Sequence, residues 1–337
     1  MLPSMTKMVS SELQEAAASG DVEAAIRALD AGASLWDSNL AGQNAFMLTI
    51  AHQEEDLGLL LLGRMLESQR NRSWLLQTAK TTGNNYLHQC ISSQTPRLLN
   101  VLLKVAGDLR PGLLRQSNAQ GTSPFFMAID FQNERSLALL LKFDRDLLEE
   151  CLDGFSPLSR AIHEDSGKIT EALLKQGASV LLPPQDPAWS QVKTVEMLER
   201  LAKRPELSLP SARTGQADSL LQVLVKRGAA LKLPLLKASR RLLKDDGLLK
   251  ERNARQQTLL HLATANRCSP DVVDFLVKEG LFWTAVDVDG QTPLDNLPTG
   301  ANAYTQSQQD RWHSQQREQS LDQALPGAKA DPVRVRF

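Results

Sequence analysis

Aromatic residues are scarce in this 337-residue chain, since Phe, Trp and Tyr together make up 5% of it while 42% of its residues are hydrophobic. Leu and Ala must therefore fill most of the interior, which suits thin helices that pack closely. A single compact core would be unusual at this length. A stack of small repeats, each touching only its neighbours, avoids that limit.

Cysteine is also rare. The chain contains only Cys90, Cys151 and Cys268, a scattered set without the Cys-x-x-Cys spacing of a metal or redox site. We interpret them as reduced, buried thiols, which fits a reducing compartment. Cys90 lies two residues after His88, and on a helix this spacing points the two side chains to different faces. A Cys/His nucleophile pair is therefore not expected.

Long hydrophobic runs are absent as well. The longest Leu-rich run, residues 57–62, is far shorter than the roughly 20 apolar residues that a membrane-spanning helix needs. Residues 1–8 lack the apolar stretch of a secretory signal. We therefore expect no membrane span and a cytoplasmic location, with delivery by a specialised secretion system left open because such signals need not be hydrophobic.

An excess of one charge is missing too. The chain carries 38 basic and 39 acidic residues, a formal net charge of −1. The molecule as a whole is therefore neither a general binder of polyanions nor an acidic tail protein, and charge has to be interpreted locally.

The chain does contain a recurring pattern of two short helices, which is clearest in residues 257–280. Thr258 can cap the first helix with its hydroxyl. Val272, Val273 and Leu276 lie on one face of the second helix. Gly280 then supplies the positive φ that ends a helix. Such a hairpin cannot bury its own apolar face and needs copies of itself beside it.

These copies are present. Full-length copies occupy residues 11–33, 156–178 and 207–229, partial copies begin at Asn44, Asn85 and Ser123, and a half-copy begins at Gly290. The copies open on Thr258-Leu259-Leu260-His261, Asn85-Tyr86-Leu87-His88, Ser123-Pro124, Ser156-Pro157-Leu158 and Thr292-Pro293-Leu294.

The pattern resembles the ankyrin repeat, which has a period of roughly 33 residues and a Thr-Pro-Leu-His-x-Ala signature. The resemblance covers about residues 11–297, although no copy carries the full signature. It implies an all-α, ankyrin-repeat α-solenoid of about seven helix-turn-helix repeats with irregular insertions. Hairpin-like connections, which we call fingers, would join the repeats. His88 and His261 occupy the signature His position, where the family's imidazole bridges backbone groups of adjacent repeats.

The predicted organisation follows from this register. Residues 1–10 form a flexible N-terminus, residues 11–297 form the array, and residues 298–337 form a tail for which we expect disorder or a weak helix. The predicted repeats lie near residues 11–33, 44–66, 85–107, 123–145, 156–178, 207–229 and 258–280, with a half-repeat at 290–297 and inserted helices near 189–204 and 235–246. The segment around Trp74 and the Leu pairs at 113–114, 147–148 and 248–249 should pack beneath the fingers.

The resemblance implies a non-catalytic protein-protein interaction module that binds a partner through finger tips and the inner face. We expect no cofactor or metal, and a monomer. Exposed aromatic residues are favoured anchors at interfaces. The candidate protein-binding residues therefore lie in the first and last fingers: Trp36, Asp37, Asn39, Phe282, Trp283 and Asp287. Packing of each Trp against a neighbouring finger is the alternative.

A second candidate surface is basic. Residues 226–255 contain ten Lys or Arg and three Asp or Glu, a local charge of +7. The predicted docking ridge consists of Lys237, Arg240, Arg241 and Lys244. It would suit an acidic protein or an anionic surface, whereas nucleic acid is disfavoured because the stretch has no aromatic residue for stacking. A solvated ridge without a partner is the alternative.

Two other functions stay open. One is an enzyme with a site in the irregular 181–258 region, although no triad, metal-ligand set or phosphate loop is recognisable there. The other is an inhibitor or host-directed effector that acts by sequestering its partner. The sequence names neither the partner nor the pathway.

Overall fold

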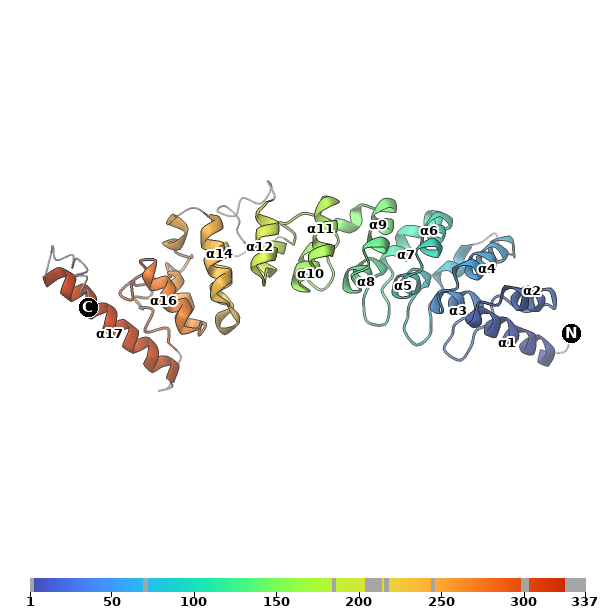
Figure 1. The fold of residues 1–337 in the computed structure, drawn as a ribbon, viewed down its shortest axis with the longest axis horizontal. Coiled ribbons are helices and arrows are strands. Elements are labelled where there is room, and N and C mark those ends of the chain that lie inside the picture. Colours follow the sequence, from blue (N-terminus) through green and yellow to red (C-terminus); the bar gives the residue numbers. More distant parts are fainter. Residues whose placement is uncertain are drawn as a thin grey trace, which may run out of the picture. The chain divides into compact units, whose positions relative to one another are not determined.

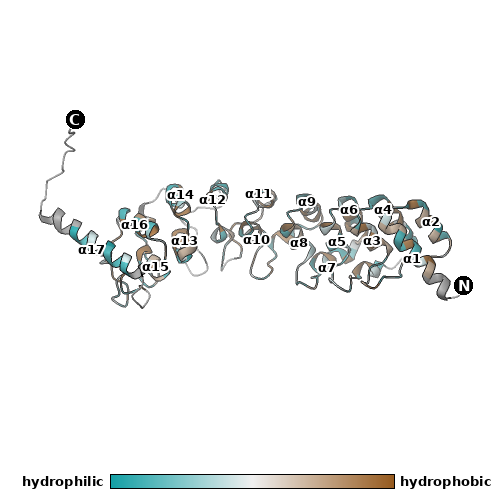
Figure 2. Ribbon diagram, turned by 60° about the horizontal axis from the view of Figure 1, so that its bottom comes forward, coloured by the Kyte–Doolittle hydropathy of each residue, from teal (hydrophilic) through white to brown (hydrophobic). Residues whose placement is uncertain are grey.

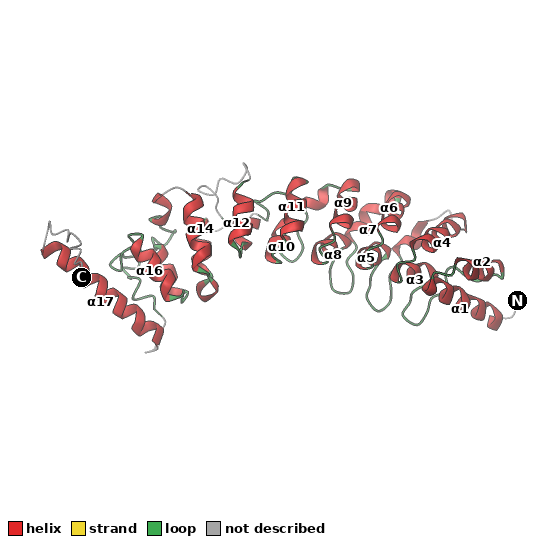
Figure 3. Cartoon of the chain, in the orientation of Figure 1, coloured by secondary structure: helices red, strands yellow, loops and turns green. Residues whose placement is uncertain are grey.

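The structure is a computed structural model that describes residues 3–68, 72–183, 186–203, 214, 218–243, 246–297 and 303–324. Its chain divides into two compact units, Met1–Pro183 and Pro184–Phe337, which are described separately. Seventeen α-helices and six short 3-10 helices make up the regular structure of the described residues (Figure 3). The predicted all-α, ankyrin-type fold is confirmed.

The first unit consists of helix pairs, each pair made of an inner and an outer helix. Among its described residues the pairs are α1 (Pro3–Ser19) with α2 (Val22–Asp30), α3 (Ala45–Ala51) with α4 (Glu55–Ser68), α5 (Tyr86–Ser92) with α6 (Pro96–Val105), α8 (Pro124–Asp130) with α9 (Glu134–Phe143), and α10 (Pro157–His163) with α11 (Gly167–Lys175). The inner helices α1, α3, α5, α8 and α10 contact one another in that order, and the outer helices α4, α6, α9 and α11 form a second row (Figure 1).

Local chemistry fixes where the inner helices begin. Side chains of Asn44, Asn85, Ser123 and Ser156 accept hydrogen bonds from the first-turn N–H groups of α3, α5, α8 and α10. These N–H groups have no partner inside the helix, so each cap stabilises its helix by about 1 kcal/mol.

Short helical connectors close the underside of the fingers. They are η1 (Arg72–Leu76), η2 (Gly107–Leu109), α7 (Arg110–Arg115) and η3 (Asp146–Glu149). Trp74 and the Leu pairs 113–114 and 147–148 are buried, as expected for apolar plugs. In the second unit η6 (Asp246–Leu249) buries Leu248 and Leu249 in the same way.

In the second unit, the repeat boundaries differ from those predicted from the sequence. Its inner row consists of η4 (Ala188–Gln191), α13 (Leu220–Lys226) and α15 (Leu259–Ala265), and its outer row of α12 (Val195–Ala202), α14 (Leu233–Leu243) and α16 (Pro270–Lys278). The helix predicted as an insertion near 189–204 therefore divides into η4 of the inner row and α12 of the outer row, and the one near 235–246 corresponds to the outer helix α14. The predicted repeat at 207–229 contributes an inner helix, α13, and its residues 207–213 and 215–217 lie outside the described part.

The reason for this difference is the role of Gly228. Gly32, Gly177 and Gly280 follow outer helices and have φ of 92°, 94° and 90°. Gly228 has φ of 61°, within the range of 52–74° found between the inner and outer helices of other repeats, and it opens η5 (Gly228–Ala230). The sequence Gly228-Ala229 therefore resembles the end of a repeat but forms the turn between the inner and outer helices of one repeat.

The N-terminal end of the chain differs from the prediction, whereas the C-terminal segment forms a helix, one of its two expected outcomes. The first helix begins at Pro3, so residues 3–10 extend α1 where a flexible lead-in was expected. Residues 303–324 form α17 (Ala303–Ala324), a hydrophilic helix that contacts α16 (Figure 2). Arg311 of α17 binds both carboxylate oxygens of Asp274, at 2.5 and 3.1 Å. This partly exposed ion pair links α17 to α16, and residues 325–337 lie outside the described part.

Candidate protein-interaction surface

His88 and His261 connect the inner helices α5 (Tyr86–Ser92) and α15 (Leu259–Ala265) to the next repeat. Nδ1 of His88 accepts a hydrogen bond from the Asn85 N–H at 3.2 Å, and its Nε2 lies 2.9 Å from the carbonyl oxygen of Thr122. His261 repeats this arrangement with the Thr258 N–H at 3.2 Å and the Gln291 carbonyl at 3.0 Å. Only a neutral ring protonated on Nε2 satisfies both bonds. Burial lowers the pKa of both imidazoles and favours this neutral form. The predicted bridging role is confirmed.

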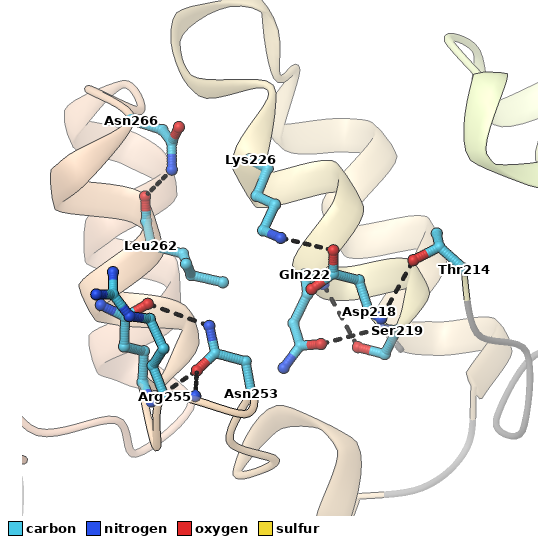
Figure 4. Close-up of polar contacts among 10 residues, drawn as sticks. Thr214, Asp218, Ser219, Gln222, Lys226, Asn253, Arg255, Leu262 and Asn266 are labelled. Carbon is cyan, nitrogen blue, oxygen red and sulfur yellow. Dashed lines mark hydrogen bonds and ion pairs between the residues drawn. The ribbon is translucent and has the colours of Figure 1, made fainter. Parts of the chain in front are cut away.

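Gln222 occupies the equivalent position of α13 but makes only half of this connection. Its Oε1 accepts the Ser219 N–H at 2.9 Å, which reproduces the helix cap (Figure 4). Its Nε2 is buried and has no hydrogen-bond partner. The bridge to the finger of the following repeat is therefore missing here.

Asx turns build the fingers. The Oδ1 atoms of Asn118, Asn253 and Asp287 each accept two backbone N–H groups within the same finger, at 2.9–3.0 Å. In Asp287, burial raises the pKa, but the N–H donors of Gln291 and Asp289 outweigh it and hold the pKa below its usual value. These turns satisfy their own polar groups and leave other side chains free to face outward.

Neighbouring fingers are linked by their backbones. The N–H groups of Lys80, Ala119 and Val288 donate to the carbonyls of Ala41, Thr82 and Arg255 in the preceding finger, at 3.2, 2.9 and 3.1 Å. Within each unit these bonds give the finger surface a fixed spacing, as a recognition surface requires.

In the first finger, the predicted anchor Trp36 is half-buried and packs on Trp74, with ring centroids 5.8 Å apart. Trp74 in turn packs edge-on against Tyr86 at 5.8 Å. Asp37 is exposed, whereas the Asn39 side chain accepts the Gln43 N–H within its own turn. The tip of this finger is Leu40, which is fully exposed and which the sequence analysis did not single out.

In the last finger, the three predicted residues differ in exposure. Phe282 is 53% exposed, whereas Trp283 is 1% exposed and belongs to the core. Asp287 is buried and holds the Asx turn. The structure therefore leaves Phe282 as the accessible aromatic residue of this set, with Val286 and Val288 exposed beside it in the sequence.

Two of the four residues of the predicted basic ridge form ion pairs. Arg241 forms an ion pair with Glu199 of α12 at 2.5 Å, and Arg240 with Glu279 beyond α16 at 3.4 Å. The Lys237 ammonium lies 6.0 Å from the ring centre of Phe275. Lys244 lies outside the described residues. Counting charges along the sequence missed these pairs because the acidic partners come from neighbouring outer helices.

A cluster of charged and aromatic side chains between α8 and α10 was not predicted. The Arg160 guanidinium binds both oxygens of Asp130, at 2.9 and 3.2 Å, and lies over the Phe155 ring. The Phe155 ring also contacts His163 edge-on at 5.1 Å. Phe131, the residue after Asp130, is 53% exposed. The sequence does contain a signal for the exposure of Phe131. It is an apolar residue that follows the helical pattern directly and fills no core position.

Catalytic chemistry finds little support in the described residues. No group of three or more His, Cys, Asp or Glu side chains there is placed to hold a metal ion. Burial raises the pKa of Cys90 to about 12 and that of Cys268 to about 11, so both thiols stay protonated at neutral pH. Within the 181–258 region, the buried Arg227 guanidinium donates to the carbonyls of Ser190 and Val192 and so joins η4 to α13.

No helix in the described residues is long and apolar enough to cross a membrane. Searches against protein-family models and against curated proteins found no match. A search of solved structures matched the ankyrin repeat domain of Bcl-3, described as a unique member of the IkappaB protein family. That match has 17% sequence identity and a TM-score of 0.44 and covers 88% of this chain and 97% of the other. The ankyrin-type assignment therefore rests on the helix pairs, His bridges and fingers described above.

Proposed function

We propose that this chain is a non-catalytic protein-interaction module that binds a partner protein through its finger tips and inner helix face. The observation that carries the proposal is the exposure of large apolar side chains at turns that do not need them. Leu40 is fully exposed at a finger tip, Phe131 is 53% exposed directly after the inner helix α8, and Phe282 is 53% exposed in the last finger. Exposed apolar side chains at rigid positions are typical anchors for protein partners.

The surroundings of these side chains support the proposal. Asn39 and Asp287 accept backbone N–H groups in the turns of the first and last fingers, so Leu40 and Phe282 are not required to hold these turns. Phe131 follows Asp130, whose carboxylate is fixed by Arg160. A partner would therefore meet a surface that is ordered before binding, which reduces the entropy lost on association.

A quantitative pull-down with mass spectrometry tests the proposal. Partners recovered with the parent chain should be depleted by Phe131→Asp or Phe282→Asp, with circular dichroism and melting unchanged because both side chains face solvent. Val22→Asp, at an exposed apolar position that opens the outer helix α2, is the matched control and should retain them. Recovery that is equal for all four proteins would contradict the proposed surface.

The outcome of binding, whether regulation, inhibition or sequestration of the partner, depends on the partner itself. The alternative enzyme in the 181–258 region gains no specific observation in its favour. Turnover by the isolated chain in a broad hydrolase and transferase screen would revive that alternative.

A further inference from the structure

A recurring ion pair joins neighbouring outer helices of this chain. In each case the later helix supplies an Arg and the preceding outer helix supplies a carboxylate. The pairs are Arg97 of α6 with Asp56 of α4 at 2.8 Å, Arg241 of α14 with Glu199 of α12 at 2.5 Å, and Arg311 of α17 with Asp274 of α16 at 2.5 Å. By this contact α17 takes the position of a further outer helix beside α16 (Figure 1).

The face that α17 turns toward α16 differs from that of the other outer helices. The outer helices α12 and α16 each bury three large apolar side chains: Met197, Leu198 and Leu201, and Val272, Val273 and Leu276. In α17, Gln308 lies one turn before Arg311 and is fully buried, and Trp312 is half-buried. A polar amide therefore stands where an outer helix of this chain has an apolar residue.

The contacts that hold α17 are weak. Neither the Oε1 nor the Nε2 of Gln308 has a hydrogen-bond partner, and burial of an unpaired amide opposes docking of the helix. The side chains of Arg311 and Asp274 are 28% and 41% exposed, so water and salt reduce the strength of their ion pair. Helices in proteins owe most of their stability to packing, so α17 should separate from α16 at a low cost.

The surface of α16 beside Asp274 is suited to a more apolar helix. Pro270 lies four residues before Asp274 and Val277 three residues after it, so all three share one face of α16. Both apolar residues are half-buried with α17 in place. Separation of α17 would therefore leave two apolar side chains and one carboxylate without their cover.

We propose that this face of α16 binds an amphipathic helix of a partner protein, which displaces α17. The partner helix continues the outer row, presents an Arg to Asp274 and places a large apolar residue one turn before that Arg, at the position of Gln308. An apolar residue there needs no hydrogen-bond partner, so the partner helix binds more tightly than α17 does. In the free chain α17 covers the site and limits access to it. This site rests on the proposed interaction function but lies on the outer helices, away from the finger tips.

Other occupants fit this face less well. A second copy of the chain would offer its own α17, which carries the same Gln308 and so gains nothing over the α17 already in place. An extended segment needs unpaired backbone groups to pair with, and a helix such as α16 satisfies its backbone groups internally.

Hydrogen exchange of the full chain tests whether Gln308 weakens the docking of α17. Gln308→Leu should slow the exchange of α17 amide protons at least tenfold, because it replaces the unpaired amide with an apolar side chain. Gln309→Leu is the matched control, since Gln309 is the next residue of the same helix and is exposed. It should change the rates by no more than about twofold. Equal rates in both variants would overturn the proposal.

Fluorescence anisotropy tests the binding site itself. The probe is a fluorescein-labelled peptide with the sequence of residues 303–324 and Gln308→Leu. We expect it to bind the full chain carrying Arg311→Glu at least tenfold more tightly than the parent chain, because that substitution repels α17 from Asp274 and frees the site. A peptide with Gln309→Leu instead should bind the Arg311→Glu chain at least tenfold more weakly than the probe.

An exchange of charges identifies the face that is bound. Asp274→Arg also repels α17, yet the probe should not bind this chain, because its own Arg now meets an Arg. Adding Arg311→Asp to the probe should restore binding to the Asp274→Arg chain. Equal binding to the parent and Arg311→Glu chains, or no restoration by the exchanged charges, would contradict the site.

Sedimentation of the Arg311→Glu chain distinguishes the remaining occupant. We expect a monomer, whereas a dimer that the probe dissociates would assign the face to a second copy and overturn the proposal. If the peptide experiments fail while partner capture still depends on Phe131, this site is wrong and the proposed function stands.

Discussion

Replacing Gln222 with His should stabilise the second unit, because it restores a connection that two other repeats contain. In those repeats the His Nε2 donates to a finger carbonyl at 2.9 and 3.0 Å. The carbonyl of Gln257 is the equivalent acceptor here, since it accepts the Asn253 N–H at 3.1 Å just as the Gln291 carbonyl accepts the Asp287 N–H at 2.9 Å. Gln222 leaves its buried Nε2 unpaired instead.

The expected gain follows from two contributions. A new hydrogen bond adds about 1 kcal/mol, and removal of a buried unpaired donor is worth about 1–3 kcal/mol. Because the two partly overlap, we expect a net gain of roughly 1–3 kcal/mol in the free energy of unfolding. The amide protons of the 253–257 finger should then exchange about five to a hundred times more slowly, at 1.4 kcal/mol per factor of ten.

The gain should depend on pH. Burial lowers the pKa of His88 and His261, and the same environment should lower that of an imidazole at position 222. The unfolded chain then binds a proton that the folded chain does not. The stabilisation is therefore complete above the ordinary His pKa of about 6.5 and decreases as pH falls below it.

Hydrogen exchange at pH 8 and urea unfolding at pH 8 and pH 5 measure these effects. His88→Gln is the reciprocal variant. It should remove from the first unit the bridge that Gln222 fails to make in the second, so amide exchange should become slower nowhere in the chain. If Gln222→His is no more stable than the parent at pH 8, or if its gain persists unchanged at pH 5, the bridging argument is wrong.

Three further predictions concern packing, the backbone and thiol reactivity. Trp283→Ala should lower the free energy of unfolding by about 3–5 kcal/mol, measured by urea denaturation, because a fully buried indole is lost; an effect below 1 kcal/mol would place this residue outside the core. Gly228→Ala should lower the free energy of unfolding by more than about 2 kcal/mol. Gly228 has φ of 61°, and an added Cβ would overlap a backbone carbonyl of the next repeat. An unchanged melting curve would refute the assigned turn. A maleimide at pH 7 should modify the exposed Cys151 first, while Cys90, with its pKa raised to about 12, should react only on unfolding; mass spectrometry of the digested protein decides the order.

The repeat fold could be predicted because its signals are local. Cap residues such as Asn85 and Thr258, the signature His residues and the helix-ending Gly residues occur in register, and each acts within a few residues of itself. The misassigned stretch around Gly228 shows where such signals fail. A Gly with positive φ ends an inner or an outer helix equally well, and only the φ value and the neighbouring helices distinguish the two.

The candidate surface was less predictable, because exposure depends on packing between repeats. Phe282 and Trp283 are adjacent in sequence, yet one is exposed and the other buried. The charge of Arg241 is compensated by Glu199, which is 42 positions away.

The proposed function requires that a partner protein binds the fingers and inner helices without being chemically changed. Hydrogen exchange of the complex with the recovered partner, followed by intact-mass analysis of that partner, tests this claim most directly. We predict slower exchange around Leu40, Phe131 and Phe282 and a partner of unchanged mass. Protection absent from all three regions, or a partner whose mass changes on incubation with the chain, would contradict the claim.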